Sequence, residues 1–423
     1  MARGRAKQIK TIVALCSASF LLTVGGAASY VYFHLNGNIE TAGDLNSLTN
    51  RPKPGPPVNV LLLGSQTRDG QTGQFGGSDA TGSFGGATGT DLSDTSMLLH
   101  VAGDRKSALV VSIPRDTIVN RPACPTRDGT GTVPGQDGAM FDASMSLGGP
   151  LCAAATVEQF FHVRVDHFVR LDFNGFRKIV TYLGGVEVCI PPGGIDDPYS
   201  HLYLPPGKQV VSGDEALAFV RDRHGIGDGS DLGRIEMQKM FLTSLITKIE
   251  GSGTLSDAGK LYQLADLTTS SITTDRALGS VSALLGLAGQ VQGLKPHDID
   301  FVTLPTTQDP YDPDRVDPAP SAQAVWDLIN NDQTLAKASA AGSAPPSSLS
   351  GSAPVATSAG AGATGQPSAS PSATPSSTLA TDLKARPADT DICSNLPQTS
   401  TGTGAGSSAG TDTGTGTGTG TSG

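Results

Sequence analysis

The sequence is poor in aromatic and charged residues. Of its 423 residues only 5% are aromatic and 16% are charged. Globular chains normally carry about 25% charged residues, so these averages indicate a compact part diluted by low-complexity sequence. The single Trp, seven Tyr and 13 Phe all lie at or before Trp326, and the segment 335–423 has no aromatic residue. This Ala/Ser/Thr/Gly/Pro-rich tail lacks the side chains of a core and is predicted to be disordered.

Positive charge is also scarce, with 29 Lys and Arg against 39 Asp and Glu and a net charge of -10. This balance argues against nucleic acid as a partner, because non-specific binding to it depends on many phosphate contacts. Any anion-binding site must therefore be a local cluster of basic residues.

The N-terminus has the pattern of a membrane anchor. Residues 1–10 carry four positive charges and no negative charge, and residues 11–33 are uncharged. Such a run is long enough to span a bilayer as a helix, and its basic flank predicts a cytoplasmic N-terminus and an extracellular remainder. A cleaved signal peptide is the alternative, because residues 25–29 are small. The anchor is favoured because the apolar run continues into an aromatic cluster at 30–33, which suits the outer interface.

Cysteine usage agrees with an exported domain. The sequence has no CxxC motif or Cys/His cluster, so a structural zinc site is not expected. Four cysteines follow the predicted anchor, and in an oxidising compartment they can form disulfides with three alternative pairings. We favour Cys124 with Cys152 and Cys189 with Cys393, the second of which would tie the tail to the domain.

Between anchor and tail, residues 34–57 are predicted to form a proline-rich spacer and residues 58–334 a single α/β domain. Strands are expected at 58–63, 97–101, 108–113, 167–173, 186–190 and 300–304, and helices at 153–161, 176–183, 213–222, 232–250 and near 261, 278 and 326. The alternation of these predicted strands and helices indicates the α/β fold class. The Gly/Ser-rich stretch 71–90 interrupts it as a long loop that either covers a substrate or is a mobile surface loop.

The segment Ser-Ile-Pro-Arg-Asp-Thr at 112–117 follows a predicted buried strand, where α/β folds present functional side chains. Taken alone, Arg115 and Asp116 are equally consistent with an ion pair that closes a loop. A second group of basic residues favours a functional role, because Arg221, Arg223 and Arg234 lie close together in the sequence of an acidic chain. Guanidinium groups match phosphate oxygens in bidentate geometry, so these arginines predict a phosphate-binding cleft.

Polar residues also share one face of the helix predicted at 232–250. Asp231, Arg234 and Gln238 follow the spacing i, i+3, i+7, while leucines and isoleucines mark a different face. The polar stripe is therefore free to line a cleft. The alternative is a solvated face with Asp231 as the N-cap.

Asp94 precedes a predicted strand and is a candidate ligand for Mg²⁺, which typically binds one or two carboxylates together with substrate phosphates. Taken alone, Asp94 would be favoured as a turn or cap residue.

Together these segments resemble the LytR-CpsA-Psr family of bacterial cell-envelope proteins over residues 58–249. The matching stretches are Asn-Val-Leu-Leu-Leu-Gly-Ser at 59–65, Leu-Ser-Asp-Thr at 92–95, Ser-Ile-Pro-Arg-Asp-Thr at 112–117, Val-Asp-His-Phe-Val with Leu-Asp-Phe at 165–173, Leu-Gly-Gly-Val-Glu-Val at 183–188, Ala-Leu-Ala-Phe-Val-Arg-Asp-Arg at 216–223 and Asp-Leu-Gly-Arg at 231–234. Several independent blocks agree in order and spacing, so the resemblance is specific.

The resemblance implies a three-layer α-β-α domain with a central mixed sheet and a groove for a polyprenyl-pyrophosphate-linked glycan. It also implies Mg²⁺-assisted transfer of that glycopolymer to peptidoglycan. Carried over by motif, the pyrophosphate would contact Arg115, Arg221, Arg223 and Arg234, and Gln238 would contact the phosphate or its metal. Asp94 would bind the metal, and Asp116 and Asp231 would orient the arginines.

The chain departs from the family pattern at Gln66, where the family usually has an aspartate that shares the metal with Asp94. Asp69, Asp79 and Asp91 are weaker candidates to replace it. Residues 139–142, Ala-Met-Phe-Asp, also lack the family's lysine and carry Asp142 in place of an asparagine. Three functions therefore stay open: a glycopolymer transferase, a non-catalytic binder or scaffold, and a pyrophosphatase.

Overall fold

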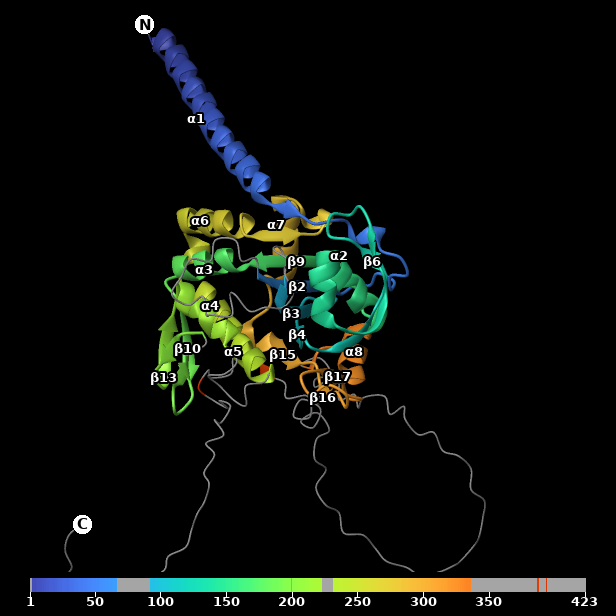
Figure 1. Ribbon diagram of the computed structural model, residues 1–423. Helices are drawn as coiled ribbons and strands as arrows, with labels where there is room; N and C mark the ends of the chain where they lie inside the picture. Colours follow the sequence, from blue (N-terminus) through green and yellow to red (C-terminus); the bar gives the residue numbers. More distant parts are fainter. Residues whose placement is uncertain are drawn as a thin grey trace, which may run out of the picture.

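The computed structural model describes residues 2–66, 92–198, 200–222, 231–335, 386–387 and 393. A long helix, α1 (Ala2–Asn38), projects from one end of an α/β body (Figure 1). It contains the segment 11–33 that was predicted to be the anchor. None of the helices in the described ranges combines the length and apolar character that crossing a membrane requires.

The body is built on one eight-stranded sheet. In spatial order its strands are β1 (Glu40–Thr41), β14 (Ile272–Thr274), β9 (His167–Asp172), β2 (Val58–Gln66), β3 (Leu92–Val101), β4 (Ala108–Ile113), β15 (Ile299–Thr303) and β18 (Arg386–Pro387). Strands β9 and β2 are parallel, as are β4 and β15, and β3 is antiparallel to both of its neighbours. The sheet is therefore mixed, as predicted.

Helices cover both faces of this sheet. They are α2 (Phe141–Phe160), α3 (Phe173–Tyr182), α4 (Gly213–Arg221), α5 (Asp231–Gly251), α6 (Ala258–Thr269), α7 (Val281–Val291) and α8 (Ala322–Asn330). In Figure 1, α3, α4 and α5 lie on one side of the central strands, and α2 and α8 lie on the other. This arrangement gives the three layers that the sequence predicted.

The alternation of side chains along β3 explains the two covered faces. Leu98 packs into the cluster that contains α2 and α8 residues, including Trp326. Its neighbour Met97 packs into a separate cluster with Leu242 and Ile246 of α5. Because successive strand residues point to opposite faces, an apolar strand without alternation has to be buried on both sides.

Short elements surround the sheet. They are the strand pairs β5 (Ile118–Arg121) with β8 (Gln136–Met140), β6 (Cys124–Pro125) with β7 (Thr132–Val133), β10 (Val186–Ile190) with β13 (Gly207–Val211), β11 (Ile195–Asp197) with β12 (Leu202–Leu204), and β16 (Thr306–Gln308) with β17 (Val316–Pro318). Short 3-10 helices occur at Leu45–Ser47, Thr254–Ser256, Arg276–Leu278 and Pro296–Asp298. Most of these escaped the sequence analysis, because elements of two to five residues carry little or no periodic pattern.

Helix α2 begins well before the predicted start at residue 153. Gly149 has a left-handed backbone (φ 70°) and is followed by Pro150, so two helical segments meet at a kink. Both residues normally end a helix, which is why the first segment was not predicted.

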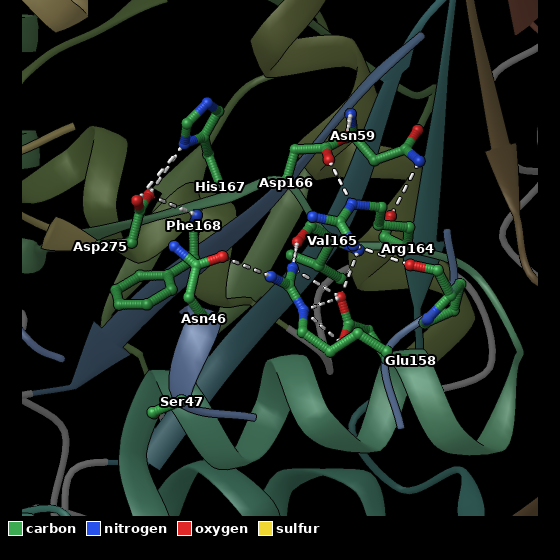
Figure 2. Close-up of polar contacts among 12 residues, drawn as sticks. Asn46, Ser47, Asn59, Glu158, Arg164, Val165, Asp166, His167, Phe168 and Asp275 are labelled. Carbon is green, nitrogen blue, oxygen red and sulfur yellow. Dashed lines mark hydrogen bonds and ion pairs between the residues drawn. The ribbon is translucent and has the colours of Figure 1, made fainter. Parts of the chain in front are cut away.

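The segment 34–57 is part of the folded body, contrary to its prediction as a spacer. Leu45 belongs to the main core. The Arg51 guanidinium donates hydrogen bonds to both carboxylate oxygens of buried Glu158, at 2.9–3.0 Å. Figure 2 shows the polar contacts around the labelled Glu158. The Pro52 carbonyl accepts from Arg164 at 2.7 Å. These contacts hold the chain against α2 and the entrance to β9 before β2 begins.

The predicted disordered tail also needs correction. Leu335 is buried in the main core. Strand β18 pairs antiparallel with β15 at the edge of the sheet, and Cys393 is disulfide-bonded to Cys189. The domain therefore includes residues from beyond its predicted end at 334. Composition alone did not predict this, because a short β-ladder and one covalent bond suffice to hold a segment that has no core of its own.

Candidate phosphate-binding site

One edge of the sheet collects the segments singled out in the sequence. Strands β9, β2 and β4 run in the same direction, so their carboxyl ends and the start of β3 lie along one side, which we call the carboxyl edge. The pairing register places Ser65 opposite Asp172, and Ser96 opposite Ile113. The segments that follow these strands therefore meet, as expected for functional residues in α/β folds.

Arg115 lies in the turn directly after β4. Its half-buried guanidinium is 3.3 Å from the Asp116 carboxylate, which is the local ion pair considered from sequence. The Thr117 hydroxyl donates to the Pro114 carbonyl at 2.7 Å, and the Arg115 carbonyl accepts from the Asp142 amide at 3.1 Å. The turn is thus fixed to the start of α2, which limits the directions in which Arg115 can reach.

Arg221 ends helix α4, and its guanidinium carbon lies 5.1 Å from the centre of the Phe173 ring. Phe173 is the first residue of α3 and directly follows β9. This cation-π contact holds Arg221 at the carboxyl end of β9. Arg115 and Arg221 therefore reach the carboxyl edge from separate segments.

Gln238 links three elements at the same edge. Its buried side-chain nitrogen donates to the Thr95 hydroxyl of β3 at 2.9 Å and to the Val220 carbonyl of α4 at 3.0 Å. Both side-chain N–H groups are thus used inside the protein. The structure therefore gives Gln238 a bracing position between α4, α5 and β3, and its contact with phosphate or metal stays a prediction.

Arg234 lies one helical turn before Gln238 on α5 and is 2% exposed. Helix α5 is buried around much of its circumference here, because Ile235, Met237 and Lys239 are buried as well. Arg234 and Gln238 therefore face packed protein rather than an open cleft. The burial of Lys239 was not predicted from the sequence, because a single lysine on a helix is normally exposed to solvent.

The backbone is irregular at Asp94. Along β2 and β3, Gly64 pairs with Thr95 and Ser65 pairs with Ser93, so Asp94 is left out of the ladder as a β-bulge. Bulges re-aim a side chain and are common beside active sites. The backbone irregularity therefore lies at the position proposed for metal binding, on the carboxyl edge.

Several predicted site residues lie outside the described part of the chain. These are Asp69, Asp79, Asp91 and Arg223, together with the side chains of Gln66, Asp94 and Asp231. Among the side chains that are described, no group of three His, Cys, Asp or Glu residues is placed to hold a metal ion.

A second buried arginine was also missed. Arg121 of β5 follows the strand alternation of buried Val119 and points inward, where an apolar residue is expected. Burial lowers the pKa of its guanidinium, and Nη2 donates to Gln136 Oε1 at 3.4 Å. The sequence signal for this burial is the spacing of Arg121, two residues after Val119, at a strand position where an apolar side chain is expected.

The structure contains the disulfides Cys124–Cys152 and Cys189–Cys393, the two pairings favoured from sequence. The first joins the β6–β7 hairpin to α2, and the second joins β10 to the C-terminal segment.

The fold is that of an α/β protein with a central mixed sheet, and Arg115 and Arg221 lie at its carboxyl edge. The chain belongs to the LytR_cpsA_psr family, whose model matches residues 32–329. Cell wall biosynthesis protein LcpA of Corynebacterium glutamicum is 30% identical over 321 residues, covering 71% of this chain and 58% of LcpA.

Polyisoprenyl-teichoic acid–peptidoglycan teichoic acid transferase TagV of Bacillus subtilis is 26% identical, covering 64% of both chains. This chain therefore spans less than two thirds of either relative. The crystal structure of protein gbs0355 from Streptococcus agalactiae superposes with a TM-score of 0.50 at 18% identity, over 65% of this chain and 87% of that one. This likeness agrees with the fold described above.

Proposed function

We propose that this protein transfers a glycopolymer from a polyprenyl-pyrophosphate carrier to peptidoglycan outside the cell. Family membership and the transferase activity in the name of TagV support the reaction class. The observation that carries the proposal is the arrival of Arg115 and Arg221 at one sheet edge from different segments, with Arg234 on the helix that braces that edge.

In the proposed reaction, a peptidoglycan hydroxyl oxygen attacks the phosphorus that carries the glycan. A new P–O bond forms, the acceptor hydroxyl gives up its proton to water, the bond to the bridging oxygen breaks, and polyprenyl phosphate leaves with the electron pair. The arginines hold the two phosphates and stabilise the negative charge that grows on the leaving phosphate. Asp116 keeps the Arg115 guanidinium in place through its ion pair.

Magnesium is part of the proposal. Bound Mg²⁺ would neutralise phosphate charge and polarise the reacting phosphate. Asp94 is the first candidate ligand, and its bulged backbone position at the carboxyl edge fits that role. Asp91, Asp69 and Asp79 are the further candidates from the sequence.

We also propose that α1 attaches the protein to the cell membrane, with residues 2–10 in the cytoplasm and the body outside. The basic flank and the uncharged run 11–33 support this orientation, and so do two disulfides, which form in oxidising compartments.

A non-catalytic role as a binder or scaffold for lipid-linked polymer is the second candidate. It is favoured by Gln66, which cannot supply the negative charge that an aspartate would bring to a metal site. Hydrolysis of the lipid pyrophosphate as a side activity is the third.

One experiment separates the three. The full chain, purified in detergent, is supplied with a polyprenyl-pyrophosphate-linked glycan, Mg²⁺ and peptidoglycan. Polymer bound covalently to peptidoglycan supports transfer, and released phosphate without attachment indicates hydrolysis. Tight lipid binding with no turnover would contradict the transferase proposal and support the scaffold.

A further inference from the structure

Helix α1 joins the body through a single residue. The helix ends at Asn38, strand β1 begins at Glu40, and Ile39 lies between them. Strand β1 pairs with β14 and forms the edge of the central sheet. The Glu40 carboxylate also accepts a hydrogen bond from the Thr273 hydroxyl at 2.9 Å. The chain therefore passes from helix to sheet within one residue, which leaves little room for a hinge.

Helix α6 holds one face of the last turn of α1. Asp266 Oδ1 accepts a hydrogen bond from the Asn38 side-chain amide at 2.9 Å and lies 2.8 Å from His34 Nε2. Because a carboxylate accepts, this ring nitrogen carries the proton. His34 and Asn38 are four residues apart, so they lie one above the other on the same face of α1. One carboxylate therefore fixes a whole turn of the helix.

Helix α7 holds a second face of the same turn. Asn36 Oδ1 accepts a hydrogen bond from the Val281 amide, the first N–H of α7, at 2.9 Å. Asn36 is two residues from both His34 and Asn38, about 200° around the helix, so its side chain points in a different direction. Leu35 between them is buried. Figure 1 shows α1 leaving the body beside α6 and α7. Contacts in different directions restrict both the tilt and the rotation of α1.

We propose that α1 and the body form one rigid unit, in which Asp266 is the residue that positions the body on its membrane helix. His34, Asn36 and Asn38 directly follow the uncharged segment 11–33. If that segment spans the bilayer, the joint lies at the outer interface, where the body meets the lipid.

The consequence for activity rests on the proposed membrane location and transfer reaction. Strands β14 and β9 separate β1 from β2, and neighbouring strands are about 4.8 Å apart, so the carboxyl end of β2 lies roughly 15 Å across the sheet from β1. A rigid joint keeps the site at a constant distance from the membrane that supplies the substrate. A swivelling body would spread the site over a larger volume and lower its effective concentration at the lipid.

Pulsed electron paramagnetic resonance tests the joint directly. In the full-length Cys16→Ser chain, both disulfides stay intact. Leu22→Cys on α1, at a residue that is 77% exposed, and Lys178→Cys, at an exposed residue of α3, carry nitroxide labels. The distribution of distances between the labels is recorded in detergent and in lipid vesicles. We expect one narrow distribution in both, and a broad distribution would overturn the rigid joint.

The contacts are tested by the triple variant His34→Ala/Asn36→Ala/Asn38→Ala. Alanine has the highest helix propensity, so α1 itself is not weakened. We expect the distribution to widen to distances absent from the parent, and Asp266→Ala alone should reproduce most of this change. The matched control, Phe33→Ala/Gly37→Ala, alters exposed residues of the same turn and should leave the width unchanged. A narrow distribution in the triple variant or in Asp266→Ala would refute the positioning role.

Transfer assays separate the joint from the reaction. With the lipid-linked substrate in the same vesicles as the protein, we expect a several-fold loss of rate in the triple variant. With the substrate dissolved in detergent, the rates of variant and parent should agree. Equal losses in both settings would show that the variant damages the body, and no loss in vesicles would refute the effect of the joint on activity. Absence of transfer in the parent would refute the proposed function, while the measured distances would still decide the rigid joint.

Discussion

Each arginine at the carboxyl edge makes one contact of modest energy that helps to place it. Arg115 forms a half-exposed ion pair, and Arg221 stacks on Phe173. Such contacts are typically worth about 1 kcal/mol or less, which is a small part of the stability of a domain. A bound pyrophosphate would gain much more from each guanidinium, since charge-assisted bidentate hydrogen bonds are stronger. Activity and stability should therefore respond differently to substitution here.

We predict that Arg115→Ala and Arg221→Ala each reduce the transfer rate by about 100-fold to 1,000-fold, the typical cost of losing one donor to developing charge. The midpoint of thermal unfolding should hardly change. The matched control is Arg315→Ala, which removes another half-exposed arginine paired with an aspartate. Unchanged transfer in either site variant would refute the assignment.

Substitution of Gln238 should reduce stability, in contrast to the arginines, because its buried side chain links α4, α5 and β3. Replacing it by Leu leaves the Thr95 hydroxyl and the Val220 carbonyl without their donor. We expect the free energy of unfolding to fall by about 1–3 kcal/mol, measured by urea denaturation. Gln323→Leu, which removes an exposed side-chain bond to Asp327, is the control and should have little effect. Equal stability losses would argue against the bracing role.

Asp128 controls the pH response of the β6–β7 turn. Hydrogen bonds from the Thr126 and Thr130 hydroxyls lower its pKa to about 2. Because the folded pKa lies below the unfolded value of 3.8, the stabilisation is present above pH 3.8 and is lost as the pH falls toward 2. We predict that the thermal stability gap between wild type and Asp128→Ala stays constant at neutral pH and narrows across this window. A gap independent of pH would contradict the hydrogen-bonded turn.

Among the elements, β3 combines regular pairing with one defined irregularity. The bulge at Asp94 lies opposite the step from Gly64 to Ser65, just before Gln66 ends β2. A residue excluded from the ladder needs no cross-strand partner, so its backbone can serve a ligand instead. Hydrophobic periodicity predicted β3 from residue 97 onward but not the bulged segment 92–96, because a bulge shifts the alternation by one residue.

We predict that Gln66→Asp strengthens Mg²⁺ binding, because a second carboxylate at the end of β2 would share the ion with Asp94. Isothermal titration of the full chain with Mg²⁺ measures the change. Asp94→Asn should weaken binding in both backgrounds. If Gln66→Asp leaves the affinity unchanged while Asp94→Asn abolishes it, another carboxylate already completes the site.

The helices show where local patterns succeed. The C-terminal boundary of α4 and both ends of α5 were predicted to within one residue, because their apolar spacing is regular. The same pattern did not show that Arg234 would be buried, since burial depends on the packing of α4, β10 and β3 around the helix.

At the scale of the whole molecule, one covalent bond joins distant parts of the chain. The Cys189–Cys393 disulfide spans 204 residues and brings the C-terminal segment to the body, where β18 completes the edge of the sheet. In the loop-entropy account, a long loop makes such a bond more stabilising, because it restricts the unfolded chain more strongly.

Removing this bond with the double variant Cys189→Ser/Cys393→Ser should lower the free energy of unfolding by roughly 2–5 kcal/mol, measured by urea denaturation. Limited proteolysis should then cut near residues 386–393 sooner. Cys16→Ser, which affects neither disulfide, is the control. Unaltered stability and protection would show that β18 holds the segment unaided.

The sequence by itself determined the α/β class and the buried strands of the central sheet. Apolar periodicity and residue chemistry are local properties, and β4 and β10 kept their predicted bounds for this reason. The family resemblance rested on short sequence motifs, which are also local properties, and the family model confirmed it.

Only the tertiary structure decided how these parts meet. It brought Arg115 and Arg221 to one edge, buried Arg234, and joined residues 34–57 and Arg386–Pro387 to the body. Each of these facts depends on contacts between residues far apart in the chain, such as Arg51 with Glu158. Composition placed both flanking segments outside the domain, because it measures how much core a segment can build and not what the rest of the chain offers it.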